Sequence, residues 1–112
     1  MLTPAFGTGP FVDLLRPANG YFLSDVRLEI PNATTAIFKA KLNGPNNRPV
    51  WARAWLSTEA GTLAEAASPQ MKAGDEVTLE VRLQGAESPR FAYLRIESMP
   101  LKTEHVVVLK LA

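Results

Sequence analysis

The stretch EVTLEVRL, residues 76–83, alternates polar and apolar side chains along its whole length. The apolar side chains all fall on one parity, at Val77, Leu79, Val81 and Leu83. A period of two is typical of a half-buried β-strand, because successive side chains of a strand point to opposite faces. We therefore predict a strand here that turns one face to a hydrophobic core.

The same period recurs along most of the chain. It predicts strands over about 22–30, 35–42, 50–56, 90–97 and 104–111, with a weaker, alanine-rich edge strand near 62–67. Runs rich in Gly, Pro and Asn separate several of these segments, as at 43–49 and 58–61. Short strands without a helix predict an all-β fold in which two antiparallel sheets bury their apolar faces against each other.

The pattern from Val26 to Leu111 resembles bacterial and phage immunoglobulin-like or fibronectin-type-III-like modules, especially in the turn MKAGDE, residues 71–76, before the alternating strand. The resemblance implies an immunoglobulin-like β-sandwich of about seven strands. It also implies adhesion, assembly or decoration as the function. The paired cysteines of antibody domains are missing, since the chain has no cysteine.

Residues 1–20 follow neither a strand nor a helix period and are rich in proline and glycine. We predict an extended N-terminal arm over 1–20 and a β-sandwich domain over 21–112. Because the arm carries apolar residues such as Phe6, Phe11 and Leu14, unlike a disordered linker, we expect it to lie on a surface. That surface is either an edge of its own sheets or a neighbouring subunit, reached by β-augmentation.

Size and charge restrict the classes of partner. The chain has 112 residues, enough for one domain, and its 12 basic and 11 acidic residues give a net charge of +1. Without a basic cluster, nucleic acid is not an expected partner. No secretory signal or long apolar segment is visible, so we expect no membrane contact and a location in a virion assembled in the bacterial cytoplasm, or in the cytoplasm itself.

Residue types that carry chemistry are sparse. His105 is the one histidine, and neither a second histidine nor a cysteine can complete a transition-metal site or a catalytic pair with it. The aspartates Asp13, Asp25 and Asp75 are too scattered to predict a calcium site. We expect no catalytic centre, no cofactor and no metal, and a structural or surface role for His105.

Two predicted strands carry aromatic residues and arginine together. Trp51, Arg53 and Trp55 share one parity of 50–56, and Phe91, Tyr93 and Arg95 share one parity of 90–97. In an immunoglobulin-like topology these strands are neighbours, and the last strand adds Val106 and Val108, between Glu104 and Lys110, to the same face.

Two orientations of this parity are open. Tryptophan in this strand commonly fills a sandwich core, which would leave the alanines outside. Burying unpaired guanidinium groups is costly, however, which favours an outward aromatic parity. Such a face would be rich in aromatics and arginine and poor in lysine and acids, which is typical of protein interfaces.

We therefore expect a non-enzymatic structural or assembly protein, most concretely a small virion accessory protein such as a capsid decoration or tail protein. Its partners would be protein subunits of a larger assembly or further copies of the chain. The alternative is a carbohydrate- or peptide-binding module in which Trp51, Trp55 and Tyr93 stack on sugar rings. The expected partner-binding residues are Phe6, Phe11, Leu14, Trp51, Arg53, Trp55, Phe91, Tyr93 and Arg95.

Overall fold

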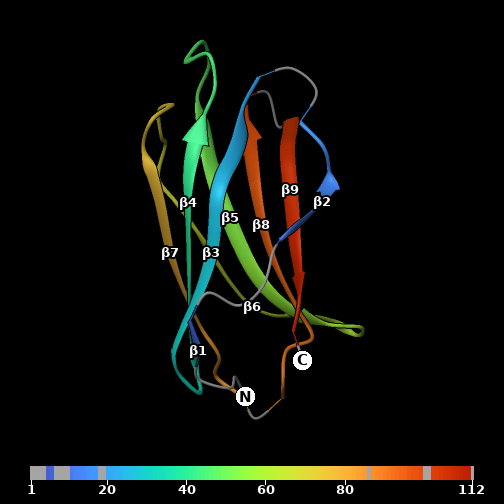
Figure 1. Ribbon diagram of the computed structural model, residues 1–112. Helices are drawn as coiled ribbons and strands as arrows, with labels where there is room; N and C mark the ends of the chain where they lie inside the picture. The colour runs from blue at the N-terminus through green and yellow to red at the C-terminus, as the bar shows by residue number, and fades with distance from the viewer. Residues whose placement is uncertain (1–4, 7–10, 18–19, 86, 100–101, 112) are drawn as a thin grey trace.

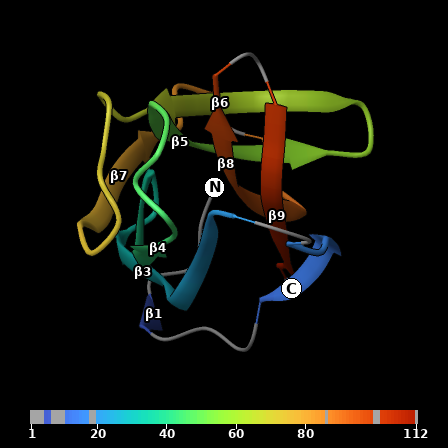
Figure 2. The same cartoon turned by 90° about the horizontal axis from the view of Figure 1, so that it is seen from above.

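Two antiparallel sheets face each other in the protein, and no helix occurs among the described residues (Figure 1). The computed structural model describes residues 5–6, 11–17, 20–85, 87–99 and 102–111. Seen from above, the sheets form two layers with the core between them (Figure 2). The predicted all-β, two-sheet sandwich is confirmed.

The strand order within each sheet follows from the backbone pairing. The first sheet has the order β1 (Ala5–Phe6), β3 (Phe22–Asn32), β4 (Thr35–Asn43), β7 (Glu76–Arg82). The second has the order β2 (Val12–Leu15), β9 (Lys102–Lys110), β8 (Phe91–Ser98), β5 (Val50–Thr58), β6 (Gly61–Ala67). The predicted pairing of β5 with β8 and of β8 with β9 is confirmed, and the weak strand β6 pairs with β5 at the edge of its sheet.

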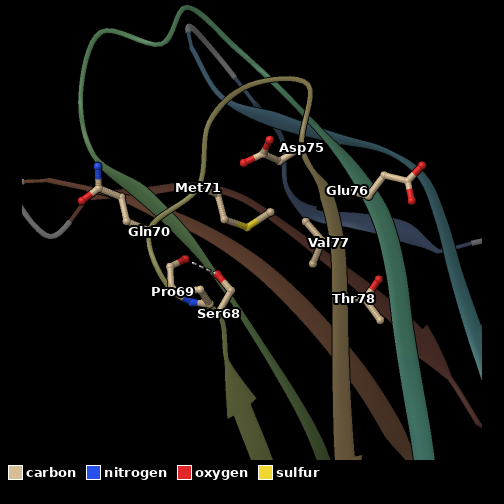
Figure 3. Close-up of a pocket in the computed structure, with 8 residues that line it drawn as sticks. All are labelled: Ser68, Pro69, Gln70, Met71, Asp75, Glu76, Val77 and Thr78. Atoms are coloured by element: carbon tan, nitrogen blue, oxygen red, sulfur yellow. Dashed lines mark hydrogen bonds between the residues drawn. The ribbon is translucent and has the colours of Figure 1, made fainter.

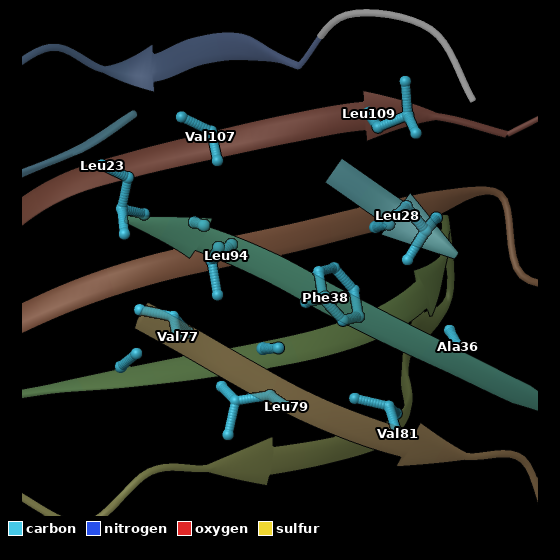
Figure 4. Packing of buried hydrophobic residues seen from close by; sticks show 14 of the residues in the cluster. Leu23, Leu28, Ala36, Phe38, Val77, Leu79, Val81, Leu94, Val107 and Leu109 are labelled. Carbon is cyan, nitrogen blue, oxygen red and sulfur yellow. The ribbon is translucent and has the colours of Figure 1, made fainter. Parts of the chain in front are cut away.

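The core lies where the apolar parities of the two sheets meet. Val77, Leu79 and Val81 point inward from β7, while the polar residues between them stay exposed. Phe38 of β4 is fully buried among side chains from both layers (Figure 4). Full burial of a large apolar side chain contributes about 1.5–3 kcal/mol, so this core is the main source of stability in a chain without disulfides.

A bulge in β3 changes which parity faces the core. The register with β4 shifts between Ser24 and Arg27, and Asp25 adopts a left-handed φ of 52°. Aspartate tolerates this conformation better than most residues. Leu23 before the bulge and Leu28 after it are therefore both buried although their parities differ.

The N-terminal segment pairs with both sheets of its own domain. Ala5 of β1 lies opposite Ile30, and Val12 of β2 lies opposite Val108. The sequence of the arm has no strand period, but the edges of β3 and β9 offer backbone groups with which an extended segment pairs whatever its side-chain period. Of the two expected surfaces, the described parts of the arm, β1 and β2, lie on edges of the domain's own sheets.

Two buried polar residues of β9 connect separate segments of the chain. The imidazole of His105 accepts a hydrogen bond from the Leu23 amide at Nδ1 (2.9 Å), and its Nε2 lies 2.6 Å from Oδ1 of Asp13. The carboxylate of Glu104 pairs with Arg48 and accepts a hydrogen bond from Ser98. His105 therefore has a structural environment that joins β2, β3 and β9.

Candidate interaction face on the second sheet

The outer surface of β5 and β8 carries the predicted aromatic parity. Ala52 and Ala54 of β5, like Leu94 of β8, are fully buried, whereas the residues between them are partly exposed. The outward orientation of the aromatic parity is confirmed, and inward packing of the tryptophans is wrong. We call this surface the aromatic face, and it consists of Trp51, Arg53, Trp55, Phe91, Tyr93 and Arg95.

Strand register brings the planar side chains of this face together. Trp55 lies directly opposite Tyr93, and their rings stack with centroids 4.8 Å apart and planes 12° apart. Phe91 tilts against Tyr93 at 6.2 Å. The guanidinium carbon of Arg95 lies 5.2 Å from the centroid of the Trp55 ring, a cation–π distance. The groups cover one another in part, which explains why an outer face is only half exposed.

Arg53 and Arg95 are also direct cross-strand neighbours. Like charges in opposite positions of a sheet destabilise it unless a countercharge lies near. Oε1 of Glu97 provides one, at 3.5 Å from Nε of Arg53 and 3.3 Å from Nη2 of Arg95. The side chain of Glu97 is only 13% exposed, so both guanidinium groups share one largely buried carboxylate.

The prediction that this face is poor in acids is wrong. Besides Glu97, Glu65 of the edge strand β6 places Oε1 3.8 Å from Nη1 of Arg53. Glu97 could have been found, since it continues the parity of Tyr93 and Arg95 by one step. Glu65 could not, because the alanine-rich sequence of β6 does not reveal its register with β5.

The contribution of β9 to the face is smaller than predicted. Val106 is buried, because β9 is not an edge strand and Val106 lies between Arg95 on one side and Leu15 of β2 on the other. Glu104 is buried too, since a bulge opposite Glu97 turns it away from the expected outer row. Val108 remains half exposed.

A shallow hollow of about 260 Å³ opens on the aromatic face towards β6. It is lined by two cations, one indole, one hydroxyl and one carboxylate, from Arg53, Arg95, Trp55, Thr62 and Glu65. Sequence reasoning missed Thr62, which reaches the site only because β6 folds back along β5. Charged donors, a carboxylate and a flat ring thus border a space that admits one side chain.

A second hollow, of about 370 Å³, lies between β7 and the loop after β6 (Figure 3). Met71 reaches across it towards Val77, and the hydroxyl of Ser68 donates to the carbonyl of Pro69 at 2.8 Å. Oδ2 of Asp75 accepts from the Lys72 amide at 2.9 Å. These polar groups stabilise the local turns, so we assign the hollow no chemistry.

The predicted partner-binding residues of the arm lie in different environments. Phe11 packs against the core, with its ring centroid 6.4 Å from that of Phe38, so it serves its own domain. Leu14 is 63% exposed, and Val12 and Leu15 are exposed beside it. The side chain of Phe6 lies outside the described residues.

Within the described ranges, no group of His, Cys, Asp and Glu side chains is arranged to hold a metal ion. The same ranges contain no helix long and apolar enough to cross a membrane. Comparison with known proteins finds no matching family, no matching curated protein and no matching solved structure. The resemblance to immunoglobulin-like modules therefore stays a prediction.

Proposed function

We propose that this protein is a non-enzymatic structural or assembly protein that binds other protein subunits, or further copies of itself, through the aromatic face. The observation that carries the proposal is the outward layer of stacked rings and guanidinium groups on β5 and β8. Aromatic residues and arginine dominate the energetic centres of protein interfaces. Because these side chains already hold one another in place, less side-chain entropy is lost when a partner binds.

The stacking of Trp55 on Tyr93 favours a protein partner over a sugar. A sugar ring needs an uncovered aromatic ring face, and these two rings each cover one face of the other. Arg95 also lies against Trp55. Carbohydrate binding remains the second candidate because Trp51 is partly exposed at the end of the same row.

The more specific form of the proposal is a virion accessory protein, such as a capsid decoration or tail protein. The exposed aliphatic side chains of β2 support it, since a neighbouring subunit would bury them. We expect the protein to co-sediment with virion particles. If the Leu14→Ser variant no longer co-sediments, β2 is part of the contact with the particle.

Sedimentation velocity of the purified chain, alone and with candidate subunits, tests the general proposal. We expect a species larger than the 12.2 kDa monomer at micromolar concentration, and its loss in Trp55→Ser. Thr78→Ser, on the outer face of the first sheet, is the matched control and should behave as wild type. Unchanged assembly in Trp55→Ser, or a strictly monomeric chain that binds a glycan array through Trp51, would refute it.

A further inference from the structure

Arg53 and Arg95 are incompletely neutralised by their own chain. Glu97 Oε1 is near both guanidinium groups, but within the described residues neither this atom nor the two Nε–H groups makes a hydrogen bond. A guanidinium carries five N–H donors and no acceptor. Because both Nε atoms are buried, the donors that these partly exposed arginines can offer an incoming group are those of their Nη groups.

The second countercharge is held loosely. Glu65 approaches Arg53 only to 3.8 Å, beyond hydrogen-bonding distance, and its side chain is 56% exposed. Exposed pairs of this kind contribute little to stability. Its carboxylate lies at the border of the hollow that Arg53, Arg95 and Thr62 also line. An incoming anion would compete with Glu65 and not with the buried Glu97.

We propose that the aromatic face recognises a carboxylate side chain, an aspartate or glutamate of the protein partner, which enters the hollow between Arg53 and Arg95. The inference rests on the proposed function and names the chemistry that its partner must offer. The carboxylate accepts from both guanidinium groups, and the methylene of the same side chain contacts the Trp55 indole where it lines the hollow. Thr62 supplies a further hydroxyl donor at the rim.

Charge and size favour a carboxylate over a phosphate group. A phosphate brings a charge of about −1.5 to −2, which would lie beside both Glu97 and Glu65. A carboxylate brings one negative charge, and its planar shape matches the guanidinium fork. The hollow of about 260 Å³ has room for one such side chain.

Nuclear magnetic resonance of the full-length, ¹⁵N-labelled chain tests the inference. The probes are the blocked peptide acetyl-GFEFG-amide, its glutamine counterpart acetyl-GFQFG-amide, and a phosphoserine counterpart. We expect the glutamate peptide to shift the Nε–H signals of Arg53 and Arg95 and the indole signal of Trp55 with saturation. The glutamine peptide should bind about tenfold more weakly or worse, the difference expected for a charged hydrogen bond.

Three variants test the direction in which the affinity for the glutamate peptide should change. Glu65→Gln should raise the affinity for the glutamate peptide several-fold, because it removes the competing carboxylate. Arg95→Lys keeps the charge and the fold but loses the planar fork, so it should lower the affinity. Glu80→Gln, on the first sheet, is the control and should have no effect.

Three results would overturn the carboxylate inference: equal binding of the glutamate and glutamine peptides, stronger binding of the phosphoserine peptide, or no saturable shift up to about 20 mM peptide. A weaker complex in Glu65→Gln would contradict it as well. A different result, unchanged assembly of the Trp55→Ser variant, would contradict the proposed function itself. If Trp55→Ser abolishes assembly while the peptides do not discriminate, the carboxylate inference alone fails.

Discussion

Gly44 shows at the scale of a single residue how closely the loops pack onto the core. A Cβ atom added at Gly44 would lie 2.2 Å from Cδ1 of Tyr21, whose side chain is buried and donates a hydrogen bond to the carbonyl of Arg48. The ring cannot move aside without breaking that bond. The loop after β4 is thereby fixed on the end of the sandwich.

Gly44→Ala should therefore destabilise the protein by about 1–3 kcal/mol, the usual cost of forcing extra atoms into a packed site. Urea denaturation followed by tryptophan fluorescence measures the change in the free energy of unfolding. Gly85→Ala is the matched control, because no atom lies within 4 Å of its added Cβ. Equal stability of the two variants would show that the Tyr21 ring is free to shift.

Sequence reasoning located the outward residues of the face but not their contacts. The mid-strand positions of Arg53 and Arg95 favoured an outward orientation of their parity, because guanidinium groups are costly to bury. The stack of Trp55 on Tyr93 follows from the register of β5 with β8, which residues alone do not define. The burial of Glu104 could not be predicted either, since a bulge turns its side chain away from the outer face of the sheet.

At the scale of elements, β2 is attached to the sandwich almost without burying its own side chains. All four of its residues are exposed, so its position depends on backbone pairing with β9 and on the contact of Asp13 with His105. Because Nδ1 of His105 accepts a hydrogen bond from the Leu23 amide, the ring hydrogen lies on Nε2, and Nε2–H donates a hydrogen bond to Oδ1 of Asp13. One side chain thus connects an edge strand to both sheets.

His105→Phe should destabilise the protein by about 1–3 kcal/mol, since the Leu23 amide loses its buried acceptor. Asp13→Asn keeps an oxygen opposite Nε2 and should cost less than about 1 kcal/mol at its more exposed position. Hydrogen exchange adds a local readout, in which Leu23 loses protection in His105→Phe alone. Equal exchange at Leu23 in both variants would contradict this account of the contact.

Strands that show a regular alternation of polar and apolar side chains could be predicted from the sequence. Strands that form only by pairing with a neighbouring strand could not. β7 alternates polar and apolar residues so regularly that its inner face could be predicted directly. β1 and β2 lack a period, and they exist because the edges of β3 and β9 supply backbone partners. The bulge at Asp25, which changes the parity of β3 that faces the core, likewise depends on pairing with β4.

At the scale of the whole molecule, the two outer faces of the sandwich differ in character. The first sheet turns charged pairs to solvent, such as Lys39 with Glu29 at 2.9 Å and Arg82 with Glu80. The second sheet exposes the aromatic face, with its stacked rings and the two arginines that share the carboxylate of Glu97. A protein that needed only to stay dispersed would gain from two charged faces, so the contrast supports a binding role for the second sheet.

Fold class was predictable at this scale because sheets with one apolar face have few ways to bury it. The partner was not, because a fold does not fix a function. No single residue of the aromatic face identifies what it binds. Its chemistry limits the partner to a surface that complements flat rings and paired guanidinium groups.

Site-specific photo-crosslinking tests the central claim most directly. A benzophenone-bearing phenylalanine analogue replaces Tyr93 on the aromatic face, or Thr78 on the opposite sheet as control, in the cells that make the protein. We predict a discrete crosslinked protein of one mass, a subunit or a second copy, from position 93 and none from position 78. No adduct at position 93, or the same adducts from both positions, would contradict the claim that the aromatic face binds a protein partner.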